Sequence, residues 1–355
     1  MINLECPFNF TSIGQVSYNI FKELVKKETV AFFPLKDNLD VSCFEVSSED
    51  GLDIKKAYQQ SLQYDRNDNT LCVFHIRGSE QSVGREQSLY TFHETDRLTD
   101  YEINILKQKR KVFVSSKYTK EVFDSHLDGQ VEVIYAPIGF DSSSFYSIEK
   151  GNTEIITFGL RGKLEGRKNT LRILRAWVKT FGGDPRYRLD CSIHNSFYKP
   201  EEFQSMIMEA LPDKKLPWNV NMLPFLPTNK LCNSALNNAD IDLTGMSSCE
   251  GFNLPLFQSL CLGKQCIVLN AHVHKDYCND KNSILIEPNG MIDAVDNKFF
   301  LEGNIVSQGE WFDFRESDLV DAMVAAAKLG RVRNTEGEKL QSWTYEKTAE
   351  IILSQ

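Results

Sequence analysis

Short runs rich in β-branched and aromatic residues alternate with amphipathic stretches along the chain, and this alternation limits the fold more than any other feature. In the first part of the chain the expected strands are TVAFFPL, TLCVFHI, SLYTFHE, VFVSS and VEVIYAPI. GQVSYNIFKELVKK, before the first of these strands, and KYTKEVFDSHL, between the last two, have the apolar spacing of amphipathic helices. Strands that alternate with helices form parallel sheets covered by helices. We therefore predict an α/β protein.

A second series of the same kind follows the polar segment GFDSSSFYSIEKGNTE and includes the strands EIITFGL, YRLDCSIHN, VNMLPFLP, IDLTGM and SILIEP. At roughly 100 to 200 residues per domain, 355 residues suffice for two domains. We predict Rossmann-like, doubly wound domains over residues 1–145 and 146–330, and a C-terminal helix over 331–355 that packs back on the first domain. Such sheets bind ligands at the carboxyl ends of their strands, so we expect the site in a cleft between the domains.

Composition places the chain among folded globular proteins, with 41% apolar and 25% charged residues. We expect a cytoplasmic protein, because the N-terminus lacks a signal-peptide pattern and no apolar run reaches the ~18 residues of a membrane span. The nine cysteines show no CxxC spacing, which favours reduced thiols. The net charge of −9 argues against a protein that coats nucleic acid through its overall field.

The stretch EGFNLPLFQSLCLGK has the signals of a short helix with a carboxylate placed just before it. Asn253 suits the N-cap, Pro255 the first turn and Gly263 the C-terminal cap. The positive end of this helix would present free N–H groups to a phosphate or to sugar hydroxyls. These N–H groups belong to Gly251, Phe252 and Asn253. Glu250 would then lie beside the ligand, although it could also be only a favourable charge at a helix N-terminus.

Four cations lie within eight residues between a predicted strand and the next helix. They are Arg161, Lys163, Arg167 and Lys168. Such a cluster neutralises a diphosphate at strand ends, where arginine binds in a forked geometry and lysine acts as a point charge. The alternative is a solvated charged loop.

Other candidates lie where strands of the first domain end. His93 and Glu94 follow the strand SLYTFHE, and one of them could touch a sugar or polarise an acceptor. Their alternatives are a hydrogen-bonded core histidine and a carboxylate in a turn or ion pair. Gly14 would let the backbone approach a ligand before the first helix, or it forms an ordinary tight turn.

We expect no metal site. His272 and His274 lie near Asp276 but lack a further ligand and helical i,i+4 spacing, so a loop is favoured. The basic run 107–111 ends a predicted helix, where cations satisfy the helix dipole. The remaining interpretation of this run is contact with an anionic acceptor such as lipid or nucleic acid.

In this order, the segments resemble the GT-B glycosyltransferases, specifically the large retaining family 4. Its G-[RK]-x-x-x-x-K-G loop is matched by Gly162, Lys163 and Lys168, with Asn169 in the last position. Its E-x7-E motif is matched by Glu250, with Gln258 in place of the second glutamate. The segments SIGQVSYNIFKEL, TFHETDRLTDYEINIL, VFVSSKYTKEVF and VIYAPIGFDSSSF resemble the corresponding parts of the first domain. The resemblance spans nearly the whole chain.

The resemblance implies an acceptor-side first domain and a second domain that binds a nucleotide-sugar donor. Lys163 and Lys168, with help from Arg161, would bind the diphosphate and stabilise the departing phosphate. Glu250 and the following N–H groups would contact the donor sugar, and Gln258 would replace the carboxylate that normally grips the ribose. By resemblance the enzyme works without a metal or other cofactor. We assign catalytic roles to Glu250, His93, Glu94 and Lys168.

The sequence thus predicts a retaining glycosyltransferase that moves a hexose or pentose from a nucleotide-diphosphate sugar to a hydroxyl. The acceptor is open among a glycan, a lipid, a small molecule and a modified DNA base, and the charge does not favour nucleic acid or a membrane surface. Two alternatives remain: another GT-B sugar-nucleotide enzyme such as an epimerase or phosphorylase, and a non-catalytic module that binds nucleotide sugars or glycans.

Overall fold

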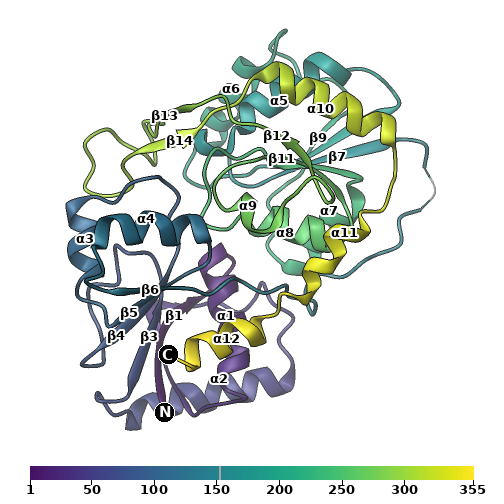
Figure 1. Cartoon of the computed structure of the whole chain (residues 1–355). Coiled ribbons are helices and arrows are strands. Elements are labelled where there is room, and N and C mark those ends of the chain that lie inside the picture. The colour runs from purple at the N-terminus through teal and green to yellow at the C-terminus, as the bar shows by residue number, and fades with distance from the viewer. Residues whose placement is uncertain (152) are drawn as a thin grey trace.

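The computed structural model describes residues 1–151 and 153–355, apart from the side chains of residues 36–38. Two six-stranded sheets form two lobes that face each other (Figure 1). All strand pairs within each six-stranded sheet are parallel. The predicted α/β class with two Rossmann-like sheets is therefore confirmed.

The first lobe contains the sheet with strand order β2-β1-β3-β4-β5-β6. Its strands are β1 (Ile2–Phe8), β2 (Val30–Leu39), β3 (Asn69–Val73), β4 (Gln87–Thr91), β5 (Lys111–Val114) and β6 (Glu132–Tyr135). Its helices are α1 (Ser12–Leu24), α2 (Ser48–Gln60), α3 (Asp100–Leu106), α4 (Lys117–Leu127) and the 3-10 turn η1 (Ser61–Gln63). Strand β1 is buried along its whole length because it lies inside the sheet, between β2 and β3.

The second lobe contains the sheet with strand order β12-β11-β10-β7-β8-β9. Its strands are β7 (Ile156–Arg161), β8 (Tyr187–Ser192), β9 (Val220–Met222), β10 (Ile241–Gly245), β11 (Gln265–Leu269) and β12 (Ile284–Ile286). Its helices are η2 (Gly166–Lys168), α5 (Thr170–Phe181), α6 (Pro200–Ala210), α7 (Asn229–Asn238), α8 (Leu254–Cys261), α9 (His274–Tyr277) and α10 (Glu316–Leu329). An antiparallel pair, β13 (Met291–Asp293) and β14 (Glu310–Phe312), was not predicted.

The C-terminal segment differs from the single helix that the sequence suggested after α10. It forms α11 (Thr335–Glu338), the 3-10 turn η3 (Lys339–Ser342) and α12 (Tyr345–Leu353). The break occurs because Trp343 is extended and the Thr344 side chain caps α12 by accepting a hydrogen bond from the Lys347 N–H. Helix α12 packs against α1 of the first lobe, and Lys27 pairs with Glu350 there at 3.0 Å. The chain therefore ends on the lobe in which it begins (Figure 1).

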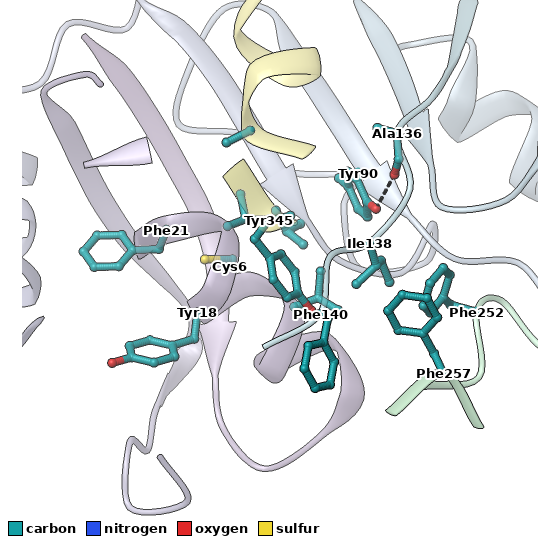
Figure 2. Close-up of a cluster of buried hydrophobic side chains, with 14 of the residues drawn as sticks. Cys6, Tyr18, Phe21, Tyr90, Ala136, Ile138, Phe140, Phe252, Phe257 and Tyr345 are labelled. Carbon is teal, nitrogen blue, oxygen red and sulfur yellow. Dashed lines mark hydrogen bonds between the residues drawn. The ribbon is translucent and has the colours of Figure 1, made fainter. Parts of the chain in front are cut away.

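One hydrophobic cluster joins the two lobes. It combines first-lobe residues such as Phe21 and Tyr90 with Phe252 and Phe257 of the second lobe and Tyr345 of α12 (Figure 2). Tyr90 donates a hydrogen bond of 2.6 Å to the Ala136 carbonyl within it. Because this cluster is continuous, the lobes are packed together on this side. No helix in the described part of the chain is both long and apolar enough to span a bilayer.

Candidate nucleotide-sugar site

A cavity of about 500 Å³ lies between the carboxyl ends of the two sheets. The first lobe contributes residues that follow β1, β3 and β4, together with the start of α1, and the second lobe contributes the loop after β7 and the start of α8. The charged side chains that line it are Glu94, Lys163, Glu165, Arg167, Lys168 and Glu250. Ligand sites of doubly wound sheets occupy this position.

Glu250 is the centre of the charged part of this cavity and is 5% exposed. One carboxylate oxygen accepts a hydrogen bond from Lys168 Nζ, and the other lies 2.8 Å from Arg167 Nη1. Burial alone would raise the pKa of Glu250, but the positive charges of Arg167 and Lys168 hold it well below the usual carboxyl value. The pairing of Lys168 with Glu250 was not foreseen, although both residues were predicted to belong to the site.

Arg167 lies near three carboxylates, those of Glu94, Glu165 and Glu250. The sequence indicated it only as one member of the cation cluster. Its Nε lies 3.0 Å from Glu165, its Nη1 donates to the Cys249 carbonyl at 2.9 Å, and its Nη2 lies 4.0 Å from Glu94. Burial opposes its charge, but Glu250, Glu165 and Glu94 together raise the pKa of Arg167 well above the usual value. Because Glu94 belongs to the first lobe, Arg167 is also a charge link between the lobes.

The helix signals in the Glu250 stretch describe α8 correctly. Asn253 is the N-cap, in the left-handed conformation with φ +67°, and Pro255 lies in the first turn. Within the described residues, the backbone N–H groups of Gly251, Phe252, Asn253 and Leu254 have no hydrogen-bond acceptor. These residues line the cavity, so the positive end of α8 faces it. The start of α1, with Ser12 and Ile13, lines the same cavity from the other lobe.

The loop after β7 brings two of its predicted cations to the cavity. Lys163 and Lys168 both line it, and Gly162 turns the chain between β7 and Lys163 with φ +113°. Arg161 lies deeper: its guanidinium pairs with the buried Asp242 and donates to Ser259. Burial lowers the pKa of Arg161 to about 10. Its positive charge is therefore balanced largely by a carboxylate of the second lobe.

A second cavity of about 260 Å³ adjoins the first and shares Ser12, Lys163 and Leu254 with it. Gln258 lines this second cavity, and its side-chain amide has no hydrogen-bond partner among the described residues. Aromatic residues around it are Phe10, Phe145, His194 and Phe225. No carboxylate is among its lining residues in the described chain. Its charged lining residues are Arg161 and Lys163, so it carries only positive charge, whereas the first cavity carries charges of both signs. We call the first the charged cavity and the second the Gln258 cavity.

His93 and Gly14 do not line either cavity, whereas Glu94 does. His93 is buried, and its Nε2 lies 2.9 Å from the Arg97 carbonyl and 3.1 Å from the Thr95 hydroxyl. Gly14 packs against Asn9, where a Cβ would come within 2.5 Å of the Asn9 backbone nitrogen. His93 thus matches its alternative, a core histidine, whereas Gly14 lies in the first turn of α1 and not in a tight turn before it.

His272 and His274 are buried and bound to the protein. His272 Nε2 lies 3.0 Å from the Ser247 carbonyl, and His274 Nδ1 lies 3.0 Å from the Leu269 carbonyl. Burial lowers the pKa of His272 to about 4, so its ring is neutral at physiological pH. Across the described residues, no group of three or more His, Cys, Asp or Glu side chains could hold a metal ion.

Solved structures of known proteins share this fold over almost the whole chain. The sucrose-phosphate synthase of Thermosynechococcus elongatus is 11% identical, with a TM-score of 0.68 and coverage of 99% of this chain and 97% of that one. HepE of Anabaena, solved with UDP and glucose, is 12% identical, with a TM-score of 0.64 and coverage of 99% and 98%. A glycosyltransferase of Rickettsia africae ESF-5 is 12% identical, with a TM-score of 0.64 and coverage of 99% and 96%.

No protein-family model matches the chain, and no curated protein does. At these low identities the likeness concerns the fold, and it agrees with the two parallel sheets and the cavity between them. The chain therefore has the GT-B fold of glycosyltransferases.

Proposed function

We propose that this protein is a retaining glycosyltransferase that transfers a sugar from a nucleotide-diphosphate sugar to an acceptor hydroxyl. The observation that carries the proposal is the convergence of Lys163, Lys168 and the free N–H groups at the start of α8 on one cavity between the lobes. Cations and helix N-termini both stabilise phosphate, and stabilisation of the leaving diphosphate is the main electrostatic requirement of glycosyl transfer.

The two adjoining cavities suit the two ends of such a donor. The sugar and diphosphate would occupy the charged cavity, and the nucleoside would occupy the Gln258 cavity. HepE, which shares the fold, was solved with UDP and glucose, and this makes UDP the first nucleotide to test. Gln258 offers the ribose one acceptor oxygen and one NH2 group in place of two carboxylate oxygens.

Glu250 would accept hydrogen bonds from sugar hydroxyls. Its two cationic partners keep it ionised, and an ionised carboxylate is a strong acceptor. Glu94 lines the opposite wall and is a candidate contact for the sugar or the acceptor. His93 does not line the cavity, so its effect on the reaction would be indirect.

The resemblance to family 4 supports retention of the anomeric configuration and catalysis without a metal or other cofactor. The acceptor would enter along the first lobe, which carries 17 Lys and Arg against 23 Asp and Glu within residues 1–150. This acidic balance favours a neutral acceptor over an anionic one.

A donor screen tests the proposal. The protein is incubated with a panel of UDP-, GDP-, ADP- and dTDP-sugars, with and without candidate acceptors, and released nucleotide is measured together with product mass. We expect nucleotide release from at least one donor in the presence of EDTA. Binding of a nucleotide sugar without release of nucleotide under any condition would favour the non-catalytic binding module instead.

A further inference from the structure

The backbone that presents the free N–H groups of α8 is held from behind by hydroxyl groups. Ser115 Oγ donates a hydrogen bond of 2.8 Å to the Gly251 carbonyl. Tyr277 Oη donates one of 2.6 Å to the Phe252 carbonyl. Both side chains are buried, at 1% and 3% exposure, so water does not compete for these carbonyls.

Holding these two carbonyls fixes the direction of the next two N–H groups. In a planar trans peptide, the carbonyl oxygen of one residue and the N–H of the next point in opposite directions. The bond from Ser115 to the Gly251 carbonyl therefore orients the Phe252 N–H. The bond from Tyr277 to the Phe252 carbonyl likewise orients the Asn253 N–H.

His274 holds the third element of this loop, the side chain of Asn253. The Leu269 carbonyl can only accept, so His274 Nδ1 carries the proton and its Nε2 accepts from Asn253 Nδ2 at 2.9 Å. The second Nδ2 proton goes to the Thr244 carbonyl at 3.1 Å. The Asn253 oxygen is thereby turned toward the Leu256 N–H at the start of α8.

Ser115 belongs to the first lobe, whereas the loop that it holds belongs to the second. The lobes meet closely here, because a Cβ on Gly251 would lie 2.8 Å from Phe92 Cβ. Helix α9, which carries His274 and Tyr277, also contacts the first lobe through Asp276, which accepts from the Lys117 N–H at 2.8 Å. The orientation of the loop therefore depends on contact between the lobes.

We propose that Ser115 and Tyr277 are positioning residues that aim the N–H groups of residues 252 and 253 into the cavity, while His274 holds the Asn253 side chain that caps α8. Ser115 completes this arrangement only when the lobes are packed together. This inference rests on the proposed function, in which these N–H groups bind the diphosphate of the donor. It predicts that the anion affinity of the second lobe depends on a hydroxyl supplied by the first.

The test removes single hydroxyl groups and compares matched controls. Ser115→Ala and Tyr277→Phe each delete one buried hydroxyl that donates to a loop carbonyl. Ser79→Ala and Tyr90→Phe delete equivalent buried hydroxyls, which donate to the carbonyls of Ile76 and Ala136 at 2.8 and 2.6 Å in the first lobe. Calorimetry measures the affinity of the full-length variants for pyrophosphate and for UDP, and thermal unfolding measures their stability.

We expect the double variant Ser115→Ala/Tyr277→Phe to bind both ligands roughly tenfold more weakly, the factor that one net hydrogen bond can represent. The double control Ser79→Ala/Tyr90→Phe should lose similar thermal stability and keep its affinities. Equal affinities in the two double variants would overturn the inference, as would a wild type that binds no pyrophosphate. If pyrophosphate binding behaves as expected but no nucleotide sugar is turned over, the inference stands and the proposed function fails.

Discussion

The two adjoining cavities share lining residues, but the polar side chains in the two cavities are paired differently. In the first, Glu250 is paired with Arg167 and Lys168 before any ligand is present. In the second, the side-chain amide of Gln258 has no hydrogen-bond partner among the described residues, and Phe10, Phe145, His194 and Phe225 form part of the wall. The charged cavity is therefore organised by its own ion pairs, whereas the polar group of the Gln258 cavity would be satisfied by a ligand.

This difference predicts that substitutions in the two cavities affect activity and stability differently. A change in the charged cavity removes both a ligand contact and the partner of a buried charge, so it lowers activity and stability together. A change of Gln258, which has no hydrogen-bond partner among the described residues, alters affinity and leaves stability nearly unchanged. The following predictions are ordered from the largest expected effect to the smallest.

Lys168→Ala should have the largest effect, with turnover lowered by roughly three orders of magnitude or more because the leaving phosphate loses a cation. The free energy of unfolding should also fall, by up to about 3 kcal/mol, because Glu250 then keeps only Arg167 as a partner. Steady-state kinetics and urea unfolding measure the two quantities.

A compensated variant separates the two effects. Lys168→Met combined with Glu250→Gln removes both charges and should recover most of the lost stability without recovering activity. Recovery of turnover in this double variant would show that Lys168 serves only to neutralise Glu250.

Glu250→Gln alone should lower turnover by about two orders of magnitude, because an amide accepts sugar hydroxyls less strongly than a carboxylate does. It should change the donor KM less than it changes kcat if the contact tightens in the transition state. A loss confined to KM would assign Glu250 to ground-state binding.

The acid dependence of stability should reveal the Glu250 ion pairs. Its pKa is depressed in the folded protein, so its stabilising contribution is complete above the ordinary value of about 4.5 and is lost as the pH falls through the lower folded pKa. Urea unfolding at pH 7, 5 and 4 should show a gap between wild type and Glu250→Gln that narrows with acidity. A gap that widens would contradict this sign.

Gln258→Glu should have the smallest effect. It restores two acceptor oxygens beside the proposed ribose and should tighten UDP binding by no more than about tenfold, with little change in melting temperature. Calorimetry with UDP and with 2′-deoxy-UDP measures the gain. Equal changes for both nucleotides would mean that residue 258 does not contact the 2′-hydroxyl.

Periodicity and end signals predicted much of the fold. The alternation of apolar runs indicated both sheets, and the Asn253, Pro255 and Gly263 signals indicated both ends of α8, where Gly263 has φ +72°. These features are local, because they depend on side-chain spacing and on backbone conformations that few residues adopt. The cation cluster and Glu250 were also predicted to lie in the same region of the molecule.

The directions in which side chains point could not be predicted from the sequence. SLYTFHE contained both His93 and Glu94, but β4 ends at Thr91, and only Glu94 of the two lines the cavity. Arg167 was not distinguishable from its neighbours, because its role depends on carboxylates more than 70 residues away on either side, Glu94 and Glu250. The hairpin β13–β14 and the break at Trp343 were missed because each depends on a few residues without strong periodicity.

The most direct test of the account is a crystal structure of the protein with UDP. The account predicts the diphosphate within hydrogen-bond distance of Lys163, Lys168 and the N–H groups of residues 252 and 253, and the uridine in the Gln258 cavity. Ordered UDP that binds elsewhere, or a diphosphate that contacts neither Lys168 nor the start of α8, would contradict it.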